Sequence, residues 1–252
     1  MSQKIAIITG GSRGLGKNAA LHLAQQGVDV ILTYHSKQAE ALAVVAEIKT
    51  YGRLAAALQL DVGNVRSFDA FATQTKQVLA QTWQRKDFDY LVNNAGTGVH
   101  AAFPETSEEQ FDAMVNIHFK GVFFLTQKLL PLIADHGRIL NVSTGLTRFA
   151  LAGYSAYAAT KGAVEVLSRY LAKELGARGI AVNTLAPGAI ETDFGGGAVR
   201  DNSVLNTYIA SQTALGRVGQ PDDIGGVVAA LLGEQSGWLN AQRIEASGGM
   251  FI

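Results

Sequence analysis

Short apolar runs recur along the whole chain. Each is four to seven residues long and is bounded by glycine or by polar residues. Runs of this kind are typical of strands that are buried on both faces of a parallel sheet. We therefore predict seven strands, over residues 4–9, 28–34, 54–60, 88–92, 138–142, 180–185 and 242–245.

Between these runs, apolar residues recur every three or four positions, as they do in amphipathic helices. The predicted helices cover residues 15–26, 38–51, 65–83, 107–132, 152–178 and 221–232. Gly27 and Gly52 stand where helix C-terminal caps are expected, and Ser107 with Gln110 forms a capping-box pattern. The alternation of strands and helices predicts an α/β fold: one doubly wound parallel sheet of the Rossmann type, with helices on both faces.

No linker, repeat or low-complexity segment divides the 252 residues, so we predict one nucleotide-binding domain over residues 1–252. One segment departs from the pattern. Residues 191–213, which include three consecutive glycines at 195–197, show no clear period. Long irregular segments in compact domains are usually lids or binding loops. We predict a substrate lid over about residues 190–213.

Composition narrows the classes of function. Hydrophobic residues make up 48% of the chain and charged residues 17%, which predicts a large core. The formal net charge is zero and no Lys/Arg-rich run occurs, which argues against a nucleic-acid partner. The absence of cysteine excludes disulfides and thiolate catalysis. No apolar run has membrane-spanning or secretory-signal length, so we expect no membrane association and a cytoplasmic protein.

A glycine-rich segment, residues 9–16, joins the first predicted strand to the first helix. Gly10, Gly14 and Gly16 permit a tight turn and close backbone approach, and the helix N-terminus presents amides to a diphosphate. The spacing G-x-x-x-G-x-G differs from the usual G-x-G-x-x-G, and a ligand-free turn is the alternative. Its position directly after a buried strand favours a dinucleotide.

The residues that follow the second strand bear on which dinucleotide binds. Chains that bind NAD place an acidic residue there for the ribose hydroxyls. Residues 33–37 instead read Thr-Tyr-His-Ser-Lys. Arg13, Ser36 and Lys37 could bind a 2′-phosphate, so NADP(H) is favoured over NAD(H). A merely solvated Arg13 is the competing interpretation.

Tyr157 and Lys161 lie four positions apart in the predicted helix 152–178 and therefore share a face. A free phenol has a pKa of about 10, and a nearby ammonium favours the phenolate and lowers that pKa. The pair could then exchange a proton with an oxygen atom on a substrate carbon. Taken alone, a surface pair without function explains the spacing as well.

Several motifs in order give the chain a resemblance over its full length to the short-chain dehydrogenase/reductase family. It is similar in particular to NADP-dependent carbonyl reductases, 3-oxoacyl-[acyl-carrier-protein] reductases and glucose dehydrogenases. The motifs are Thr9-Gly10, Gly14-Leu15-Gly16, Asp61-Val62, Asn93-Asn94-Ala95-Gly96, Asn116, Ser143, Tyr157, Lys161, Pro187-Gly188 and Ile190-Glu191-Thr192.

The resemblance implies four catalytic residues. Tyr157 would be the acid/base, and Lys161 would bind the nicotinamide ribose and lower the Tyr157 pKa. Ser143 would donate a hydrogen bond to the substrate carbonyl. Asn116 would hold a water near Lys161 that relays protons to solvent, with a purely structural hydrogen bond as the alternative.

The resemblance also implies the cofactor contacts. The 93–96 turn would lie beside the adenosine ribose, Asp61 and Val62 at the adenine, and Ile190 and Thr192 at the carboxamide. The expected cofactor-binding residues are Gly10, Ser12, Arg13, Gly14, Leu15, Gly16, Tyr34, His35, Ser36, Lys37, Asp61, Val62, Asn93, Ala95, Gly96, Tyr157, Lys161, Pro187, Gly188, Ile190 and Thr192.

Substrate choice is expected to depend on residues 145–155 and on the lid. The expected substrate-binding residues are mostly apolar or aromatic: Ser143, Gly145, Leu146, Phe149, Tyr154, Tyr157, Gly188 and Phe194. They offer no anchor for an anion, although Arg148 could serve as one if it is not simply exposed to solvent. A neutral ketone, aldehyde or secondary alcohol is the substrate class that this lining favours.

We therefore predict an NADPH-dependent carbonyl reductase, or secondary alcohol dehydrogenase, that uses Tyr157 as acid/base. Reduction of 3-oxoacyl-[acyl-carrier-protein] and sugar oxidation are alternatives within the family, and a catalytically silent nucleotide-binding regulator is the non-enzyme alternative. No metal site is expected, because the histidines lack metal-ligand spacing.

The resemblance also implies a homotetramer. The helices 107–132 and 152–178 would pair across a two-fold axis, and the apolar tail Met250-Phe251-Ile252 suggests burial against another subunit. The alternative is that these helices are buried only within their own subunit.

Overall fold

The computed structural model describes residues 3–252, and its centre is one parallel sheet. The strands are β1 (Ile5–Ile8), β2 (Asp29–Tyr34), β3 (Ala55–Gln59), β4 (Phe88–Asn93), β5 (Ile133–Val142), β6 (Ala181–Pro187) and β7 (Arg243–Ala246). They pair in parallel in the order β3-β2-β1-β4-β5-β6-β7. The predicted seven-stranded parallel sheet is confirmed, with β5 starting five residues earlier than expected.

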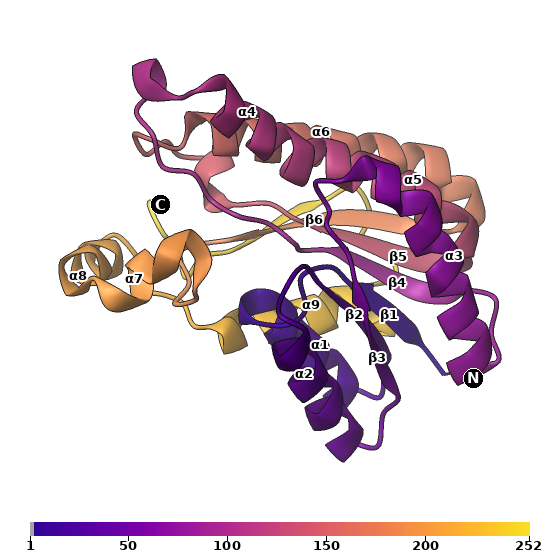
Figure 1. Ribbon diagram of the computed structural model, residues 1–252. Coiled ribbons are helices and arrows are strands. Elements are labelled where there is room, and N and C mark those ends of the chain that lie inside the picture. Colours follow the sequence, from indigo (N-terminus) through magenta and orange to yellow (C-terminus); the bar gives the residue numbers. More distant parts are fainter. Residues whose placement is uncertain (1–2) are drawn as a thin grey trace.

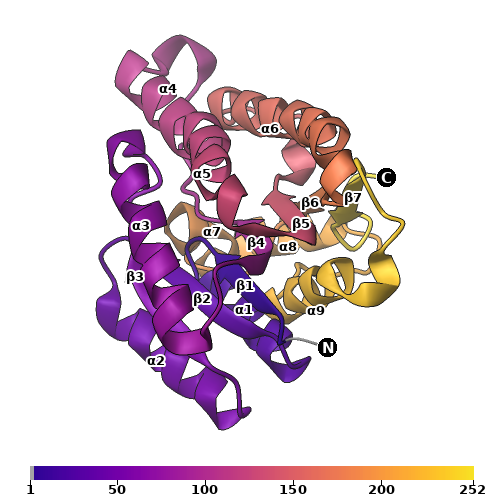
Figure 2. The same cartoon turned by 90° about the vertical axis from the view of Figure 1, so that its right-hand side faces the viewer.

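Helices cover both faces of this sheet (Figures 1 and 2). One layer contains α1 (Gly14–Gln25), α2 (Gln38–Thr50) and α9 (Pro221–Leu232). The other contains α3 (Phe68–Val78), α4 (Glu108–Met114), α5 (Gly121–Leu129) and α6 (Ser155–Leu175). This is the doubly wound Rossmann-type α/β arrangement that the sequence predicts.

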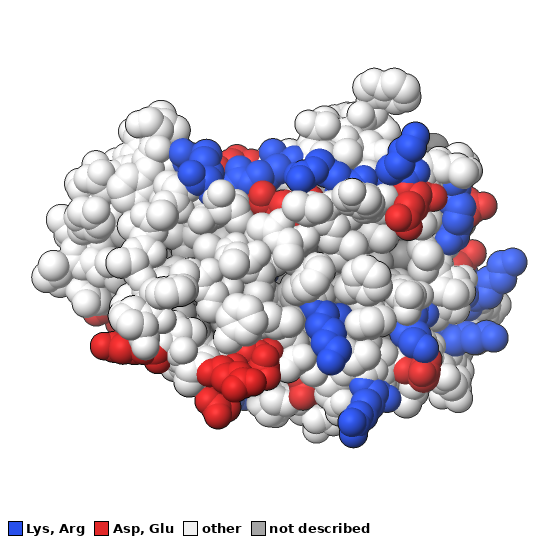
Figure 3. All heavy atoms as spheres, turned by 90° about the horizontal axis from the view of Figure 1, so that it is seen from above, with Lys and Arg blue, Asp and Glu red and all other residues white. Residues whose placement is uncertain are grey.

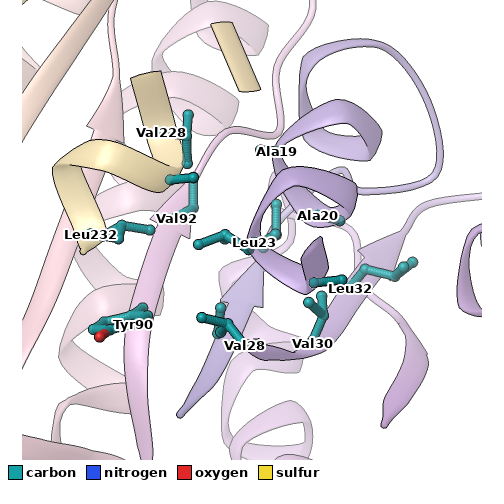
Figure 4. Packing of buried hydrophobic residues seen from close by; sticks show 14 of the residues in the cluster. Ala19, Ala20, Leu23, Val28, Val30, Leu32, Tyr90, Val92, Val228 and Leu232 are labelled. Carbon is teal, nitrogen blue, oxygen red and sulfur yellow. The ribbon is translucent and has the colours of Figure 1, made fainter. Parts of the chain in front are cut away.

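Each layer packs on the sheet through its own hydrophobic cluster. In the first, Leu23 of α1 and Val228 of α9 meet Val92 of β4 (Figure 4). Gly225 lets α9 approach α1, because a side-chain carbon there would overlap the Asn18 side chain. In the second cluster, Phe68 of α3 packs with residues of α5, α6 and the opposite side of the strands.

The predicted helix 107–132 is not continuous. After α4 the chain forms a π-helical turn, η4 (Val115–Lys120), then α5 and a short 3₁₀ turn, η5 (Leu130–Leu132). The capping box is confirmed: the Gln110 amide donates to Ser107 Oγ at 3.2 Å, and the Ser107 amide donates to Gln110 Oε1 at 3.0 Å. The predicted helix 65–83 likewise consists of a 3₁₀ turn, η1 (Val65–Ser67), then α3 and a π-helical turn, η2 (Leu79–Trp83).

The prediction of an irregular segment over 191–213 is wrong. That segment contains a 3₁₀ turn, η8 (Phe194–Gly197), and two helices, α7 (Ala198–Asp201) and α8 (Ser203–Ser211). Gly195, Gly196 and Gly197 have φ of 60°, 74° and 78°, a region that favours glycine. These left-handed residues break the helical period. In Figure 1 the segment projects to one side of the two helical layers.

The loops that follow β1, β4, β5 and β6 leave the sheet at one edge. Strand order reverses between β1 and β4, which places a crevice outside the carboxyl ends of these strands. Ligands in open α/β sheets bind at such a switch point. None of the helices within residues 3–252 combines the length and the apolarity needed to cross a bilayer.

Candidate active site

Tyr157 and Lys161 lie on the first two turns of α6 and are both buried, with 7% and 4% of their surface exposed. Lys161 Nζ lies 5.8 Å from the centre of the Tyr157 ring and donates a hydrogen bond to the Val142 carbonyl at 2.7 Å. Val142 is the last residue of β5. The pair therefore faces the carboxyl edge of the sheet and is not a surface pair.

Burial governs the protonation of both groups. It lowers the pKa of Lys161 to about 8, because a buried ammonium loses hydration. It also raises the pKa of Tyr157, which hydrogen bonding with the Thr144 hydroxyl partly opposes. The expected effect of the Lys161 ammonium on the Tyr157 pKa stays a prediction, because burial is the largest influence on that pKa in this structure. Tyr157 is a protonated phenol at neutral pH, which suits a proton donor.

In the structure the Ser143 hydroxyl, which is expected to donate to the substrate carbonyl, donates to another residue. Ser143 is 3% exposed, and its Oγ donates to Glu165 Oε1 at 2.7 Å. The hydroxyl near Tyr157 is that of the next residue, Thr144. Thr144 has an extended backbone, in which consecutive side chains point to opposite sides. Thr144 could not be identified from the sequence, because either hydroxyl could face the helix.

The structure likewise brings His118, and not Asn116, to the catalytic pair. The His118 ring is 1% exposed and meets the Tyr157 ring edge to face, with ring centres 5.1 Å apart at 85°. Asn116 lies half-buried in the same π-helical turn, and its side chain forms no hydrogen bond with any of residues 3–252. The π turn changes which positions face α6, so helical spacing alone could not identify His118.

The glycine-rich loop has the form that a diphosphate requires. Gly10 (φ 66°) comes so close to the 93–96 turn that an added side-chain carbon would lie 2.9 Å from Ala95 Cα. A side-chain carbon added at Gly14 (φ 55°) would come into ordinary contact with Thr192 Cβ, at 3.7 Å. The first turn of α1 holds no acidic residue and no side-chain cap, so its amides are available to an anion. These residues fit a bound dinucleotide.

The 93–96 turn is fixed to this loop by hydrogen bonds. Thr9 Oγ1 accepts from the amides of Asn94 and Ala95, both at 2.9 Å. The Asn93 side chain donates to Thr126 at 3.0 Å and to Asn141 at 2.8 Å, and so joins β4 to β5 and α5. The turn therefore lies beside the glycine loop. Its expected place beside the adenosine ribose stays a prediction.

The cations expected at a 2′-phosphate are exposed and weakly paired. Arg13 Nη1 lies 3.5 Å from Asp193, and Lys37 Nζ lies 3.7 Å from Glu40. Exposed pairs of this kind contribute about 0–1 kcal/mol, so either cation can turn to a phosphate. Ser36 is exposed beside them.

The adenosine end of the expected site is a hollow of about 420 Å³ that His35 and Asp61 help to line. The prediction that Tyr34 binds the cofactor is wrong. Its side chain is buried in the cluster under α1 and α2 and is not available to a cofactor.

The remaining residues that are expected to bind the cofactor lie near the carboxyl ends of the strands. Pro187 ends β6, and the Gly188 amide donates to the Ala246 carbonyl at 3.0 Å. Ile190 forms a bridge with Gly219. Thr192 Oγ1 accepts from the Phe194 amide at 3.1 Å, and its side chain lies in front of Gly14. The other predicted positions on this edge are Ser12, Leu15, Gly16, Val62 and Gly96.

The substrate side is an apolar hollow of about 390 Å³ beside the start of α6. Leu146 and Tyr154 line it as expected, together with His100 and Phe103. Phe194 brings the lid to the site, since its ring centre lies 5.7 Å from that of Tyr157. Gly145 lies buried at the base of this loop.

Two residues next to this hollow differ from expectation. Phe149 packs against Phe251 of the C-terminal tail, with ring centres 4.7 Å apart. Arg148 is neither an anion anchor nor a free cation. It donates to Glu245 at 2.6 and 2.8 Å and to the carbonyls of Met250 and Phe251 at 2.6 and 3.0 Å.

The family model described as enoyl-(acyl carrier protein) reductase matches residues 10–251. The chain belongs to the short-chain dehydrogenase/reductase family. It is 36% identical over 251 residues to the 3-oxoacyl-[acyl-carrier-protein] reductase FabG of Staphylococcus aureus (strain Mu50), covering 99% of this chain and 98% of the relative.

Solved structures of similar short-chain reductases superpose over nearly the whole chain. The promiscuous reductase LugOII, which catalyses keto-reduction at C1 during lugdunomycin biosynthesis, has a TM-score of 0.94 and 36% identity, covering 100% of this chain and 99% of that one. The angucycline C-6 ketoreductase LanV with bound NADP has a TM-score of 0.93 and 33% identity, covering 98% and 95%.

In this short-chain dehydrogenase/reductase a polar network holds the loop that carries Thr144. Glu165 of α6 accepts from Ser143, from Thr147 at 2.7 Å and from Arg243 Nε at 2.9 Å. Arg243 also donates to the Thr144 carbonyl at 3.2 Å. The network therefore fixes the backbone on both sides of Thr144.

The same network extends from Arg243 through Glu245 to Arg148 and the C-terminal tail. Met250 is 3% exposed within its own chain, whereas Ile252 is 92% exposed. The expectation that another subunit buries the tail stays a prediction.

Proposed function

We propose that the protein is an NADPH-dependent carbonyl reductase that also oxidises the corresponding secondary alcohols. One observation carries the proposal: a buried, protonated Tyr157 faces the Thr144 hydroxyl at the sheet edge where the glycine loop begins. Two hydroxyl groups that converge on one small volume suit the oxygen of a carbonyl group.

In this mechanism the chain binds, orients and protonates. The substrate oxygen accepts hydrogen bonds from Tyr157 Oη and Thr144 Oγ1, which hold the carbonyl carbon in place. Tyr157 gives its proton to the oxygen as negative charge develops there, and the Lys161 ammonium stabilises the phenolate that remains. When bound, the nicotinamide supplies the hydride.

The proposed preference for NADPH rests on charge. The end of β2 carries no acidic residue at Thr33–Lys37, while Arg13, Ser36 and Lys37 are exposed and weakly paired. An acid there would repel a 2′-phosphate, and a guanidinium binds one well. LanV, a structural relative, holds NADP. NAD(H) is the less favoured cofactor.

For the substrate we propose a neutral ketone or aldehyde with an apolar substituent. The hollow beside Tyr154 is lined mainly by alanine, leucine and phenylalanine side chains, and Arg148 is fully engaged with Glu245 and the tail. The alternatives are a 3-oxoacyl thioester, as the name of the Staphylococcus aureus relative suggests, and a sugar. A silent nucleotide-binding regulator is the non-enzyme alternative.

A substrate panel with NADPH absorbance as readout tests the proposal. It contains aryl and alkyl ketones, 3-oxoacyl thioesters, an enoyl thioester and sugars, each measured with NADPH and with NADH. The proposal expects the highest kcat/KM with neutral ketones and NADPH. Turnover confined to thioesters or sugars would support the alternatives, and binding of NADPH without any turnover would support the regulator.

We also propose that the protein is a homotetramer assembled through the face formed by α4, α5 and α6. Phe123, Val166 and Tyr170 are 39%, 45% and 65% exposed on this face. Figure 3 looks onto it and shows a broad area without charged side chains, bordered on one side by a row of Lys and Arg. Exposed apolar surface of this kind often marks a protein interface.

A further inference from the structure

A small hydrophobic cluster outside the two cores of the sheet joins the lid to residues 248–251. Ile209 of α8 and Met250 are buried in it, with 6% and 3% of their surface exposed. Phe149 of the substrate loop, residues 145–155, packs against them. Three segments that lie far apart in the sequence therefore share one cluster.

Backbone hydrogen bonds bind residues 248–251 to the chain that follows α8. In each bond the amide of the first residue donates to the carbonyl of the second: Ala214 to Gly249 at 3.2 Å, Leu215 to Gly248 at 3.1 Å and Phe251 to Gln212 at 2.9 Å. Figure 1 shows this end of the chain beside α7 and α8. Residues 248–251 are therefore attached to the end of the lid.

Arg148 of the substrate loop holds the same segment from the other side. Its guanidinium donates to the carbonyls of Met250 and Phe251 at 2.6 and 3.0 Å, and to the Glu245 carboxylate at 2.6 and 2.8 Å. Hydrogen bonding from Arg148 holds the pKa of Glu245 at about 2, so the pair is charged at neutral pH. One side chain thus joins the substrate loop to β7 and to residues 248–251.

Aromatic packing adds to this contact. The Phe149 ring centre lies 5.3 Å from the Arg148 guanidinium and 4.7 Å from the centre of the Phe251 ring. Phe251 has a φ of 53°, in the left-handed region, which is unfavourable for a bulky side chain. Such a conformation persists where the surrounding contacts hold it. The contacts with Arg148 and Phe149 are of that kind.

Both the substrate loop and the lid contribute residues near the reacting centre. Leu146 and Tyr154 of the loop line the apolar hollow, and Phe194 of the lid lies against the ring of Tyr157. A change in the separation of loop and lid therefore changes the space beside Tyr157.

We propose that Arg148 is a positioning residue: by joining residues 248–251 to the substrate loop, it holds the lid in the arrangement that binds the ketone. This inference rests on the proposed function. Without the contact, a smaller fraction of the molecules has that arrangement, and the apparent affinity for the ketone falls in proportion. A saturating concentration of ketone restores the arrangement, so kcat is retained.

The test compares Arg148→Met, which keeps an unbranched side chain and loses the hydrogen bonds, with Arg178→Met. Arg178 is a matched control that makes the same kind of contact at the amino end of β5. It donates to Asp135 at 2.8 Å and to the carbonyls of Leu130 and Ile133. The side chains of Arg148 and Arg178 are 36% and 35% exposed.

Two quantities are measured: the KM and kcat for a ketone with NADPH, and hydrogen–deuterium exchange of the Ala214 and Leu215 amides. Arg148→Met should raise the KM about 10-fold with little change in kcat, as expected if about one molecule in ten keeps the binding arrangement. The two amides should exchange faster, because their acceptors are no longer held. Arg178→Met should leave both quantities at wild-type values.

Phe251→Ala is a second variant, which removes the ring contact and keeps Arg148. It should shift the KM and the exchange of the two amides in the same direction as Arg148→Met. If Arg148→Met does not fold, Phe251→Ala makes the comparison with Arg178→Met.

Unchanged exchange of the Ala214 and Leu215 amides in Arg148→Met would overturn the inference, and so would a loss confined to kcat. Faster exchange along the whole chain with a lower melting temperature would also overturn it, because that pattern shows a general structural role. Faster exchange of these two amides, alongside a wild type that reduces no ketone, would contradict the proposed function and still support the contact between lid and loop.

Discussion

The phenol of Tyr157 is the residue on which the proposed chemistry depends, and its surroundings set its working state. Burial favours the neutral phenol, and the adjacent Thr144 hydroxyl favours the anion. Because burial is the larger of these two influences, Tyr157 keeps its proton until negative charge develops on a nearby oxygen. The partner hydroxyl then decides how well that oxygen is held.

Replacing Thr144 by Val should lower kcat by about 10- to 100-fold, since one hydrogen bond to a developing charge contributes about 1.5–3 kcal/mol. Thr144→Ser should restore most of the rate. Steady-state kinetics with a ketone and NADPH measure both variants.

Ser143→Ala is the matched control, because Glu165 keeps its bonds to Thr147 and Arg243. A change of no more than a few-fold is expected there. If kcat falls more in Ser143→Ala than in Thr144→Val, then Ser143 and not Thr144 contacts the substrate carbonyl.

The charge of Lys161 should appear in the pH profile. Because burial lowers the pKa of Lys161 to about 8, the ammonium is present below that pH and is lost as pH rises through it. Tyr157 has a raised pKa and stays protonated, so loss of the ammonium limits the reduction. We expect kcat/KM for reduction to fall as pH rises above about 8, and a flat profile to pH 10 would contradict this assignment.

Sequence patterns could identify the residues whose relative positions follow from an ideal helix or strand. Tyr157 and Lys161 share a face of any α-helix, so their pairing follows from the four-residue spacing alone. The position of the Thr144 side chain depends on the direction that an extended residue gives it. The position of His118 depends on the π-helical turn, which changes the face on which each residue lies. A spacing argument for an ideal helix or strand contains no such information.

At the level of elements, the network from Glu165 to the C-terminal tail stabilises the substrate loop. Arg243 is 24% exposed and Glu165 13% in their side chains, so removing one charge leaves the other poorly solvated. Arg243→Met should lower the free energy of unfolding by about 1–3 kcal/mol, as measured by urea denaturation.

The control for this variant is Arg217→Met. Arg217 and Asp223 form a pair that is 52% and 39% exposed, and such exposed pairs contribute about 0–1 kcal/mol. Equal losses in the two variants would show that the buried network adds no particular stability.

Element boundaries show where sequence patterns stop being informative. The seven strands could be predicted because buried parallel strands are continuous apolar runs. The π turn at 115–120 could not, since one turn with a slightly different period leaves the apolar spacing almost unchanged. In the lid, three left-handed glycines separate short helices, and α7 has only four residues.

At the scale of the whole molecule, the uncharged face over α4, α5 and α6 predicts self-association. Val166 and Tyr170 lie four residues apart on α6 and share the exposed side of the helix. Tyr170→Glu places a charge in the proposed interface and should convert the tetramer to smaller species, as measured by light scattering after size exclusion.

Leu42→Glu is the control for self-association. Leu42 is 52% exposed on α2, in the opposite helical layer, so its substitution should leave the assembly unchanged. A wild-type protein that is already monomeric, or an equal effect of both substitutions, would contradict the proposed interface.

The most direct test of Tyr157 as the acid is Tyr157→Phe, which removes one hydroxyl and keeps the ring against His118 and Phe194. General acid catalysis predicts that kcat for NADPH-dependent ketone reduction falls by about 10²- to 10⁴-fold, while NADPH binding changes little. Fluorescence titration and NADPH absorbance measure the two quantities on the same sample. A variant that binds NADPH and reduces ketones at the wild-type rate would contradict the account.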